Sequence, residues 1–339
     1  MLKKEGNILI TGCAGFIGAA LCKRFLKDGY VVLGIDNINN YYDVKLKKDR
    51  LESIYEFALR NNLRWVFNEI SIEDRESLEN LFSRIKPKLV INLAAQAGVR
   101  YSILNPLTYF KANLEGFFNI LDLCRLNNVE HLVYASSSSI YGSSSNYPFS
   151  EEQNANEPLS FYAGTKKSNE MMAHSFSNIY KIPMTGLRYF TVYGPWGRPD
   201  MAPMIFAKNI ISNKPISVFN NGEMSRDFTY IDDIVEATFL CSLKTPTQKN
   251  QKLKKNDYVP HKIFNIGYGS TVNLLEFINL LEDALQKKAI KVFEPMQEGD
   301  VVKTFANIEK LKDWIQFQPK VSIEEGVRNF ANWYLNYFA

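Results

Sequence analysis

The sequence predicts an α/β protein built on a doubly wound parallel sheet, with a smaller C-terminal α/β domain. Three observations support this prediction. The N-terminal stretch has the pattern strand, glycine turn, helix; strand and helix patterns then alternate up to about residue 190; and the remainder of the chain is less regular. At 339 residues, the chain is long enough for one large domain or two closely joined ones.

The first element is an apolar strand over residues 7–11, followed by a glycine turn. Gly12, Gly15 and Gly18 have the spacing G-x-x-G-x-x-G, and a helical pattern continues to Leu26. In such a unit the first glycine allows the tight turn, the second lets the backbone approach a pyrophosphate, and the third lets the helix pack closely on the strand. Because unpaired N–H groups and the helix dipole favour an anion at the helix N-terminus, this stretch predicts a Rossmann dinucleotide site.

The second strand, residues 30–35, ends at Asp36, which lies 18 residues beyond Gly18. That spacing is close to the one expected for a carboxylate that binds the adenosine ribose hydroxyls. Because a carboxylate at this place repels a 2'-phosphate, the sequence favours NAD over NADP. A structural βαβ unit without a nucleotide is the alternative, and the combination of the glycines with Asp36 disfavours it.

The alternation continues beyond the second strand. A polar and aromatic loop leads into a lysine-rich helix, whose lysines we interpret as a solvated face, and the fourth strand ends in small residues that allow a ligand to approach the sheet edge. The expected elements are the helix 45–61, the strand 63–67, the helix 75–85, the strand 89–93, the helix 106–127, a strand ending in the serine run 136–139, the helix 161–180 and the strand 185–190.

The regular alternation ends near residue 190, where we place a domain boundary. Residues 1–190 are expected to form the NAD-binding Rossmann domain and residues 191–339 the second domain. Segments near 229–241 and 262–267 are expected to rejoin the first domain. The stretch 244–256 is rich in lysine and glutamine, which is typical of an exposed loop.

A candidate catalytic group lies between residues 133 and 166. The serine run at the end of an apolar strand is followed by Tyr162-x-x-x-Lys166 on a helix, where positions i and i+4 share a face. A free phenol, with a pKa near ~10, is a poor base, but a nearby cation favours the phenolate and lowers that pKa. Tyr162 could then accept a proton from a substrate hydroxyl, with a serine relaying the proton or orienting the substrate. An incidental Tyr and Lys on an amphipathic helix is the alternative.

Composition excludes several classes of protein. Hydrophobic residues make up 46% and charged residues 22%, as in an ordinary globular protein. A formal net charge of +4 is too small for a nucleic-acid-binding surface, although it suits an anionic substrate held by a few arginines. The expected partners therefore include neither nucleic acid nor membrane.

The cysteines and the N-terminus point to a reduced compartment. Cys13, Cys22, Cys124 and Cys241 form no C-x-x-C pair, and the chain has only three histidines, so we expect buried thiols and no metal site. No apolar run approaches 18 residues, and the N-terminus leads straight into a strand without room for a signal peptide. We expect a cytoplasmic protein.

Several motifs together resemble the extended short-chain dehydrogenase/reductase superfamily, in its nucleotide-sugar epimerase branch. They are Thr11-Gly12-x-x-Gly15-x-x-Gly18, Asp36-Asn37, Ser137 four residues before Tyr141-Gly142, Tyr162-x-x-x-Lys166, and Arg226-Asp227-Phe228. Three longer stretches, residues 36–44, 94–102 and 191–201, are similar to those of UDP-glucuronate 4-epimerases. The resemblance runs nearly end to end.

The resemblance implies a bound NAD that is reduced and reoxidised within one turnover. Tyr162, as a phenolate and helped by Ser137, would take the proton of the sugar 4-hydroxyl while the C4 hydride passes to the nicotinamide. Lys166 would lower the tyrosine pKa and hold the nicotinamide ribose. The 4-keto sugar would turn over about its link to UDP and take the hydride back on the opposite face. The implied reaction converts UDP-glucuronate to UDP-galacturonate, a product that suggests surface polysaccharide synthesis.

The resemblance also implies two sets of binding residues, with residues 191–339 as the nucleotide-sugar-binding domain. The NAD site would be lined by Gly12, Gly15, Phe16, Ile17, Gly18, Asp36, Asn37, Ile72, Leu93, Ala95, Asn113, Tyr162, Lys166 and Tyr189. The UDP-sugar would face Gln96, Arg100, Thr191, Arg198, Arg226 and Asp300. At two positions the sequence departs from the family pattern, and each departure is expected to weaken one contact with a ligand. Ser71 replaces an Asp that meets the adenine in many relatives, and Gln297 replaces an arginine that some epimerases carry.

The residues after Ser137 separate neighbouring branches. Dehydratases carry an Asp-Glu pair at the positions of Ser138 and Ser139, and UDP-glucuronate decarboxylases tend to carry a Glu at the second. Oxidation of glucuronate at C4 creates a β-keto acid that loses carbon dioxide easily, so hydroxyls that grip the carboxylate would retain the carbon. Ser138, Ser139 and Thr191 are the candidates. Alternatively, these hydroxyls satisfy backbone groups at a strand end, and Arg198 and Arg226 form surface ion pairs.

Other functions stay open at this point. The protein could be a 4-epimerase of neutral UDP-hexoses or UDP-N-acetylhexosamines, or a non-catalytic NAD-binding protein of the same fold. The intact set Ser137, Tyr162 and Lys166 argues against the second. The helices 106–127 and 161–180 are long and carry many apolar residues, which, with the resemblance, predicts a homodimer joined through four helices.

Overall fold

The centre of the molecule is a seven-stranded sheet in which every pair of neighbours is parallel. The computed structural model describes residues 7–247, 258–297 and 299–338. The strand order is β11-β6-β5-β4-β1-β2-β3. The strands are β1 (Ile8–Thr11), β2 (Val32–Asp36), β3 (Trp65–Glu69), β4 (Leu89–Asn92), β5 (His131–Ser137), β6 (Met184–Tyr189) and β11 (His261–Ile266). The predicted doubly wound parallel α/β fold is confirmed.

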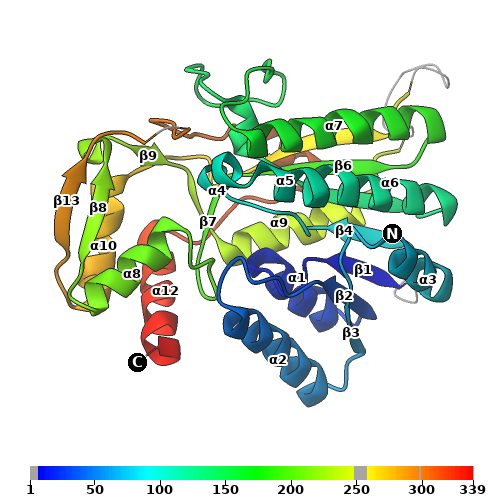
Figure 1. The fold of residues 1–339 in the computed structure, drawn as a ribbon, viewed down its shortest axis with the longest axis horizontal. Coiled ribbons are helices and arrows are strands. Elements are labelled where there is room, and N and C mark those ends of the chain that lie inside the picture. The colour runs from blue at the N-terminus through cyan, green and yellow to red at the C-terminus, as the bar shows by residue number, and fades with distance from the viewer. Residues whose placement is uncertain (1–6, 248–257, 298, 339) are drawn as a thin grey trace.

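Helices cover both faces of this sheet (Figure 1). On one face lie α1 (Phe16–Lys27), α2 (Val44–Arg60) and α9 (Ile231–Leu243); on the other lie α3 (Arg75–Ile85), α4 (Val99–Leu104), α5 (Pro106–Tyr109), α6 (Gly116–Leu126) and α7 (Phe161–Tyr180). Alternate strand residues face opposite layers, as the period of two requires. Ile8 and Ile10 of β1 join the core under α1, whereas Leu9 joins the core under α3 and α6.

Two elements differ from their predicted form. The helix expected over residues 106–127 is α5 and α6 joined by the π-helical turn η1 (Phe110–Glu115). The serine run continues β5 only as far as Ser137. The Ser137 hydroxyl accepts a hydrogen bond from the Ser139 N–H at 3.2 Å, and the 3₁₀ helix η2 (Ser138–Tyr141) starts there. This local side-chain bond competes with the strand ladder.

An ion pair fixes the middle of α7 to the sheet. Glu170 on α7 and Arg188 on β6 form a bidentate ion pair, with N–O distances of 2.8 and 2.9 Å. The Ser136 hydroxyl donates to the same carboxylate at 2.7 Å. Because both charged groups are buried and hydrogen-bonded, the pair fixes α7 against β5 and β6.

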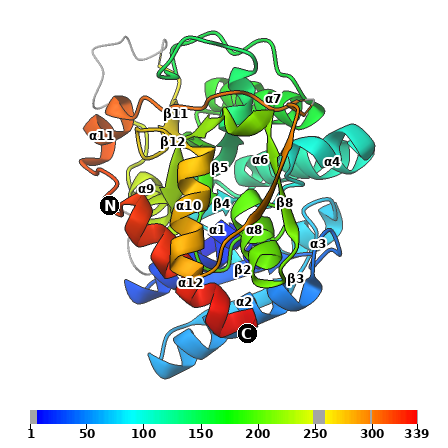
Figure 2. The ribbon, with the colours of Figure 1, turned by 90° about the vertical axis from the view of Figure 1, so that its left-hand side faces the viewer.

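The second, smaller unit lies at one end of the molecule, beside the carboxyl edge of the sheet (Figures 1 and 2). It contains three two-stranded pairs, β7 with β10, β8 with β13 and β9 with β12. Its elements are β7 (Thr191–Tyr193), α8 (Ala202–Ile211), β8 (Pro215–Phe219), η3 (Asn220–Gly222), β9 (Ser225–Arg226), β10 (Phe228–Tyr230), β12 (Val272–Asn273), α10 (Leu274–Leu285), β13 (Ile290–Glu294) and α12 (Ile323–Phe338). The short helix α11 (Glu309–Ile315) packs instead against β11 and α9, where Trp314 stacks on Phe264.

The chain crosses between the two units more than once. After β10, α9 packs beside α1, and β11 pairs with β6 at the edge of the large sheet. The domain boundary near residue 190 stays a prediction. The expected exposed loop 244–256 lies outside the described residues from residue 248 onward.

The four cysteines are buried free thiols. None of the helices in the described ranges has the length and hydropathy of a membrane span.

Candidate active site

A cavity of about 630 Å³ lies at the carboxyl edge of the large sheet. It is the place where the glycine turn after β1, Asp36 at the end of β2, the small residues after β4 and the serine run after β5 come together. Of the predicted site residues, the cavity is lined by Gly12, Gly15, Phe16, Ile17, Gly18, Asp36, Asn37, Ile72, Leu93, Ala95, Gln96, Ser137, Ser138, Ser139, Tyr162, Lys166, Tyr189, Thr191 and Arg198.

The glycine turn leaves no room for side chains. A Cβ on Gly18 would lie 2.1 Å from the Gly12 carbonyl oxygen, and one on Gly15 would lie 2.9 Å from the same atom. Gly12 has a φ of +71°, a left-handed conformation that favours glycine. No side chain caps the N-terminus of α1 and no acidic residue lies in its first turn, so the N–H groups there face the cavity as an anion site.

Asp36 is held in place by two backbone N–H groups. Its carboxylate accepts from Ala14 N at 3.1 Å and from Ile38 N at 2.9 Å. Burial raises the pKa of the carboxyl group, while the Ile38 N–H and the Lys47 ammonium act in the opposite direction. The neighbouring Asn37 side chain donates to the Ser71 hydroxyl at 3.3 Å, so the departure at residue 71 leaves a hydrogen bond within the site.

Tyr162 and Lys166 line the same cavity, and burial shifts the pKa values of both side chains. Burial lowers the pKa of Lys166 to about 8, and its ammonium donates to the Ala135 carbonyl at 2.9 Å. Burial raises the pKa of Tyr162, whereas the Ser137 hydroxyl and the Arg198 guanidinium act to lower it. In this geometry Arg198 is a second cation that favours the Tyr162 phenolate, and the role of Lys166 stays a prediction.

The candidate carboxylate-binding hydroxyls differ in how they are engaged. Ser137 Oγ donates to Ser139 Oγ at 3.1 Å, in addition to accepting from the Ser139 N–H. Within the described chain, neither the Ser138 nor the Thr191 hydroxyl takes part in a hydrogen bond, and both residues line the cavity. Of these hydroxyls, that of Ser137 binds a backbone N–H, whereas those of Ser138, Ser139 and Thr191 bind no backbone group within the described chain.

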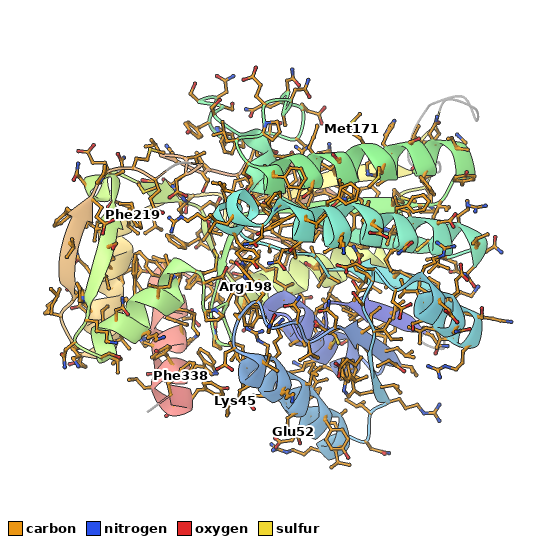
Figure 3. All side chains as sticks on the ribbon, viewed as in Figure 1. Lys45, Glu52, Met171, Arg198, Phe219 and Phe338 are labelled. Carbon is orange, nitrogen blue, oxygen red and sulfur yellow. The ribbon has the colours of Figure 1, made fainter. Side chains whose placement is uncertain are left out.

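Arg198 lines the cavity. Its guanidinium Nε donates to Asp200 at 3.0 Å, and the Tyr41 hydroxyl donates to the same carboxylate at 3.0 Å. The arginine side chain is 22% exposed, which does not fit the alternative of a surface ion pair. Figure 3 shows Arg198 near the middle of the molecule, between the two units.

Four predicted residues lie outside the cavity lining. Asn113, in the π-helical turn, is buried and binds the backbone of Gln96 on both sides, accepting from its N–H at 2.8 Å and donating to its carbonyl at 3.0 Å. It also donates to the Thr165 hydroxyl at 3.0 Å. Asn113 therefore supports the lining residue Gln96 in this structure, and direct contact with a cofactor stays a prediction.

The other three, Arg100, Arg226 and Asp300, gather at the rim. Arg100 on α4 pairs with Asp300 at 3.0 Å, and Asp300 acts electrostatically on Arg226. The Arg100 guanidinium also lies 5.0 Å from the centre of the Phe219 ring. Both neighbours of Arg100 in the chain, Val99 and Tyr101, line the cavity. Residues far apart in the sequence thus form a basic and aromatic rim.

Sequence reasoning missed several members of the site. Tyr41, Tyr101 and Lys47 all line the cavity. The interpretation of the lysines of α2 as a solvated face is wrong for Lys47, which is 5% exposed and donates to the Asn39 carbonyl at 2.7 Å. It holds for Lys45, whose side chain is 74% exposed. The helical period could have shown that the two lysines face different sides.

The sequence matches the family described as NAD dependent epimerase/dehydratase over residues 8–267. The chain belongs to this family. It is 49% identical to Protein CapI of Staphylococcus aureus over 338 residues, covering 98% of this chain and 99% of that protein. It is 45% identical to a probable UDP-glucuronate 4-epimerase of Rhizobium meliloti, covering 96% of each. Its structure resembles that of UDP-glucuronic acid 4-epimerase from Bacillus cereus in complex with UDP-glucuronic acid and NAD, with a TM-score of 0.86, 34% identity and coverage of 98% and 100%.

The residues of the cavity fit NAD, the cofactor that the glycine spacing and Asp36 predicted and that the family uses. Gly12, Gly15 and Gly18 line the cavity without side chains, so backbone alone faces a pyrophosphate at this turn. The uncapped start of α1 suits its charge, and the fixed carboxylate of Asp36 suits ribose hydroxyls.

We expect NAD to bind this protein at least about tenfold more tightly than NADP, since a 2'-phosphate beside the Asp36 carboxylate faces a like charge whose repulsion is about 1.4 kcal/mol or more in partly solvated surroundings. Isothermal titration with both cofactors measures the ratio. Asp36→Asn should narrow it, because the amide keeps the size of the side chain and removes the charge. Equal affinities in the unmodified protein would contradict the role assigned to Asp36.

Proposed function

We propose that this protein catalyses the NAD-dependent C4 epimerisation of UDP-glucuronate to UDP-galacturonate through a 4-keto intermediate. The observation that carries the proposal is the wall beside Tyr162. It presents the hydroxyls of Ser138, Ser139 and Thr191 and the guanidinium of Arg198. Neutral donors and a cation at this place suit a substrate carboxylate. The resemblance to proteins named UDP-glucuronate 4-epimerase points the same way.

In the proposed reaction, Tyr162 accepts and returns the proton of the sugar 4-hydroxyl. When bound, NAD supplies the acceptor and donor of the C4 hydride. Burial keeps Tyr162 protonated in the ligand-free protein, and Ser137 and Arg198 supply the opposing influence that favours the phenolate. Lys166, fixed to the Ala135 carbonyl, lies on the same face of α7 one turn further on. We propose that it orients the nicotinamide ribose.

The substrate carboxylate explains why hydroxyls occupy positions 138 and 139. A 4-keto uronate is a β-keto acid, and it loses carbon dioxide when the carboxylate is free to align with the ketone. Hydrogen bonds from Ser138 and Thr191, whose hydroxyls have no protein partner within the described chain, would hold the carboxylate out of that alignment. A carboxylate side chain at either position would instead repel the substrate.

A 4-epimerase of neutral UDP-hexoses is the second candidate. The hydrogen bonds between Ser137 and Ser139 favour this candidate. Because these two hydroxyls already have partners inside the protein, fewer hydroxyls are left to bind a substrate carboxylate. A non-catalytic NAD-binding protein would not need Ser137, Tyr162 and Lys166 at one cavity wall. The cytoplasmic location and the place in surface polysaccharide synthesis stay predictions.

Replacing Tyr162 with Phe should reduce epimerisation by about 10²- to 10⁴-fold while NAD and UDP-sugar binding change little, because only the oxygen that transfers the proton is lost. The measurement is turnover of UDP-glucuronate, UDP-glucose and UDP-N-acetylglucosamine by the unmodified protein and the variant, with binding of NAD and UDP followed by titration. Absence of turnover on all three substrates by the unmodified protein would count against the epimerase proposal. Substantial residual turnover by the variant would rule out Tyr162 as the base.

Single replacement of Ser138, Ser139 or Thr191 by Ala should lower the efficiency with UDP-glucuronate and raise carbon dioxide release. A hydrogen bond to a charged group contributes roughly 1.5 to 3 kcal/mol, which corresponds to about tenfold or more in kcat/KM if the contact persists in the transition state. UDP-glucose serves as the matched substrate without a carboxylate and should not be affected. Parallel losses on both sugars without extra decarboxylation would favour the neutral-sugar candidate.

We propose that the protein is a homodimer joined through the face formed by α5, α6 and α7. Large apolar side chains on these helices are exposed, among them Leu107, Phe118, Met171 and Ile179, with Met171 62% exposed. Figure 3 shows Met171 on the outer side of α7. Several large apolar side chains exposed together on a layer of helices are typical of an interface between subunits.

Light scattering at micromolar concentration should therefore give about twice the mass of one 38.9 kDa chain. Met171→Lys places a charge in the centre of this face and should shift the protein toward the monomer, because a buried unpaired charge is costly. Lys45→Glu, on the exposed side of α2, is the control and should leave the mass unchanged. A monomeric mass for the unmodified protein would dismiss the dimer.

A further inference from the structure

Arg50 is a buried cation that the proposed chemistry does not use. It lies on α2, its side chain is fully buried, and it does not line the cavity. No carboxylate of the described residues lies within ion-pair distance of its guanidinium. A buried charge is costly unless its hydrogen-bonding groups are satisfied, so its partners should show why it is there.

The guanidinium is satisfied by oxygen atoms from three separate loops. Nη1 donates to the Ala14 carbonyl at 3.0 Å and to the Tyr42 hydroxyl at 2.6 Å. Nη2 donates to the carbonyls of Trp196 at 2.6 Å and Gly197 at 3.1 Å, and Nε donates to Trp196 at 3.1 Å. The planar fork of five donors thus joins the glycine turn, the loop after β2 and the loop after β7.

The first of these partners belongs to the cofactor side of the cavity. Ala14 lies between Gly12 and Gly15, and its N–H donates to Asp36 at 3.1 Å while its carbonyl accepts from Arg50. The segment around Ala14 is therefore fixed at the N–H by a predicted ribose-binding carboxylate and at the carbonyl by Arg50.

The third loop belongs to the substrate side and is held in an uncommon conformation. Trp196 has a φ of +65°, which few residues other than glycine adopt. Its carbonyl accepts two of the five hydrogen bonds of Arg50. Such conformations are unfavourable for a residue with a side chain and persist only where the surroundings enforce them. Arg198 follows two residues later in the chain and lines the same cavity as Tyr162.

The opposite side of Trp196 is braced by the C-terminal helix. The indole ring packs against Trp333 at 5.4 Å and Tyr337 at 4.9 Å between ring centres. Both rings lie on α12, which runs beside α2 in Figure 1. The loop is thus gripped through its backbone by Arg50 and through its side chain by α12.

We propose that Arg50 is a positioning residue that holds the Arg198 loop against the glycine turn. It thereby fixes Arg198 in the wall of the cavity that Tyr162 also lines. The part of this inference that concerns turnover rests on the proposed epimerase function; the part that concerns the loop and the NAD site does not. Arg50 itself touches neither substrate nor cofactor.

Arg50→Lys keeps the positive charge but removes the five hydrogen-bond donors of the guanidinium. Because an ammonium cannot span the three loops, amide hydrogen exchange across residues 194–200 should accelerate about tenfold and NAD should bind more weakly, while the melting temperature falls only modestly. Turnover of UDP-glucuronate should fall about tenfold or more through kcat, since a small misplacement of a group near the reacting atoms is costly. Without a positioned cation the pKa of Tyr162 rises, so the rising limb of the pH profile of kcat should move to higher pH.

Arg198→Lys should shift the pH profile in the same direction, and the double variant should be no slower than the slower single variant, because both act through one contact. Trp333→Leu loosens the loop from the other side and should accelerate the same exchange, which keeps the test open if Arg50→Lys does not fold. Arg75→Gln, on α3 and paired with Glu79 and Asp122, is the control that loses stability without these effects.

The proposal is overturned if Arg50→Lys lowers only the melting temperature, with unchanged exchange in 194–200, an unshifted pH profile and losses additive with those of Arg198→Lys. If the unmodified protein turns over no UDP-sugar, the epimerase function fails, and hydrogen exchange with NAD titration still decides the role of Arg50.

Discussion

The parallel pairing of all seven strands is the constraint on which the site depends. In a parallel sheet every carboxyl end lies at the same edge, so the loops that follow β1, β2, β4, β5 and β6 converge although they are far apart in the sequence. The glycine turn, Asp36 and the serine run each gain a function only through this convergence. The ion pair between Glu170 and Arg188 then fixes α7 on the sheet and brings Tyr162 to the same edge.

The charged side chains in and around the cavity are buried, and their neighbours set their positions and their pKa values. Asp36 and Arg50 bind opposite ends of the residue Ala14, one at its N–H and the other at its carbonyl. Burial moves the pKa of Lys166 down and that of Tyr162 up, so both side chains are shifted toward their neutral forms in the absence of ligand. In the proposed mechanism, neighbouring positive charge then favours release of the Tyr162 proton. Arg198 is one source of that charge, and its position depends on a loop from the second unit.

The second unit supplies what the parallel sheet lacks. The strand ends at the sheet edge offer backbone groups and short side chains. The phosphates and carboxylate of a nucleotide-sugar are better bound by arginine, whose guanidinium is planar and is carried on a long side chain. Arg198 and Arg226 come from the second unit, and Arg100 on α4 is held to it by the ion pair with Asp300. These groups lie in or beside the wall of the cavity at the carboxyl edge of the sheet. A device such as Arg50, which ties both units together through backbone carbonyls, is therefore well placed to couple the two halves of the site.

The sequence by itself determined the sheet, the cofactor and the family, because these follow from patterns that are local in the chain. Gly12, Gly15 and Gly18 must fit one turn, Asp36 must follow one strand, and Tyr162 and Lys166 must share one helical face. Only the tertiary structure decided which charges meet. Arg198, from the second unit, lines the same cavity as Tyr162. Lys47 and Arg50 are buried although they lie in a lysine-rich helix, and Asn113 supports Gln96 from behind the cavity wall. The reason is physical: the direction of a long charged side chain is set by acceptors that belong to distant segments, and sequence spacing carries no information about them.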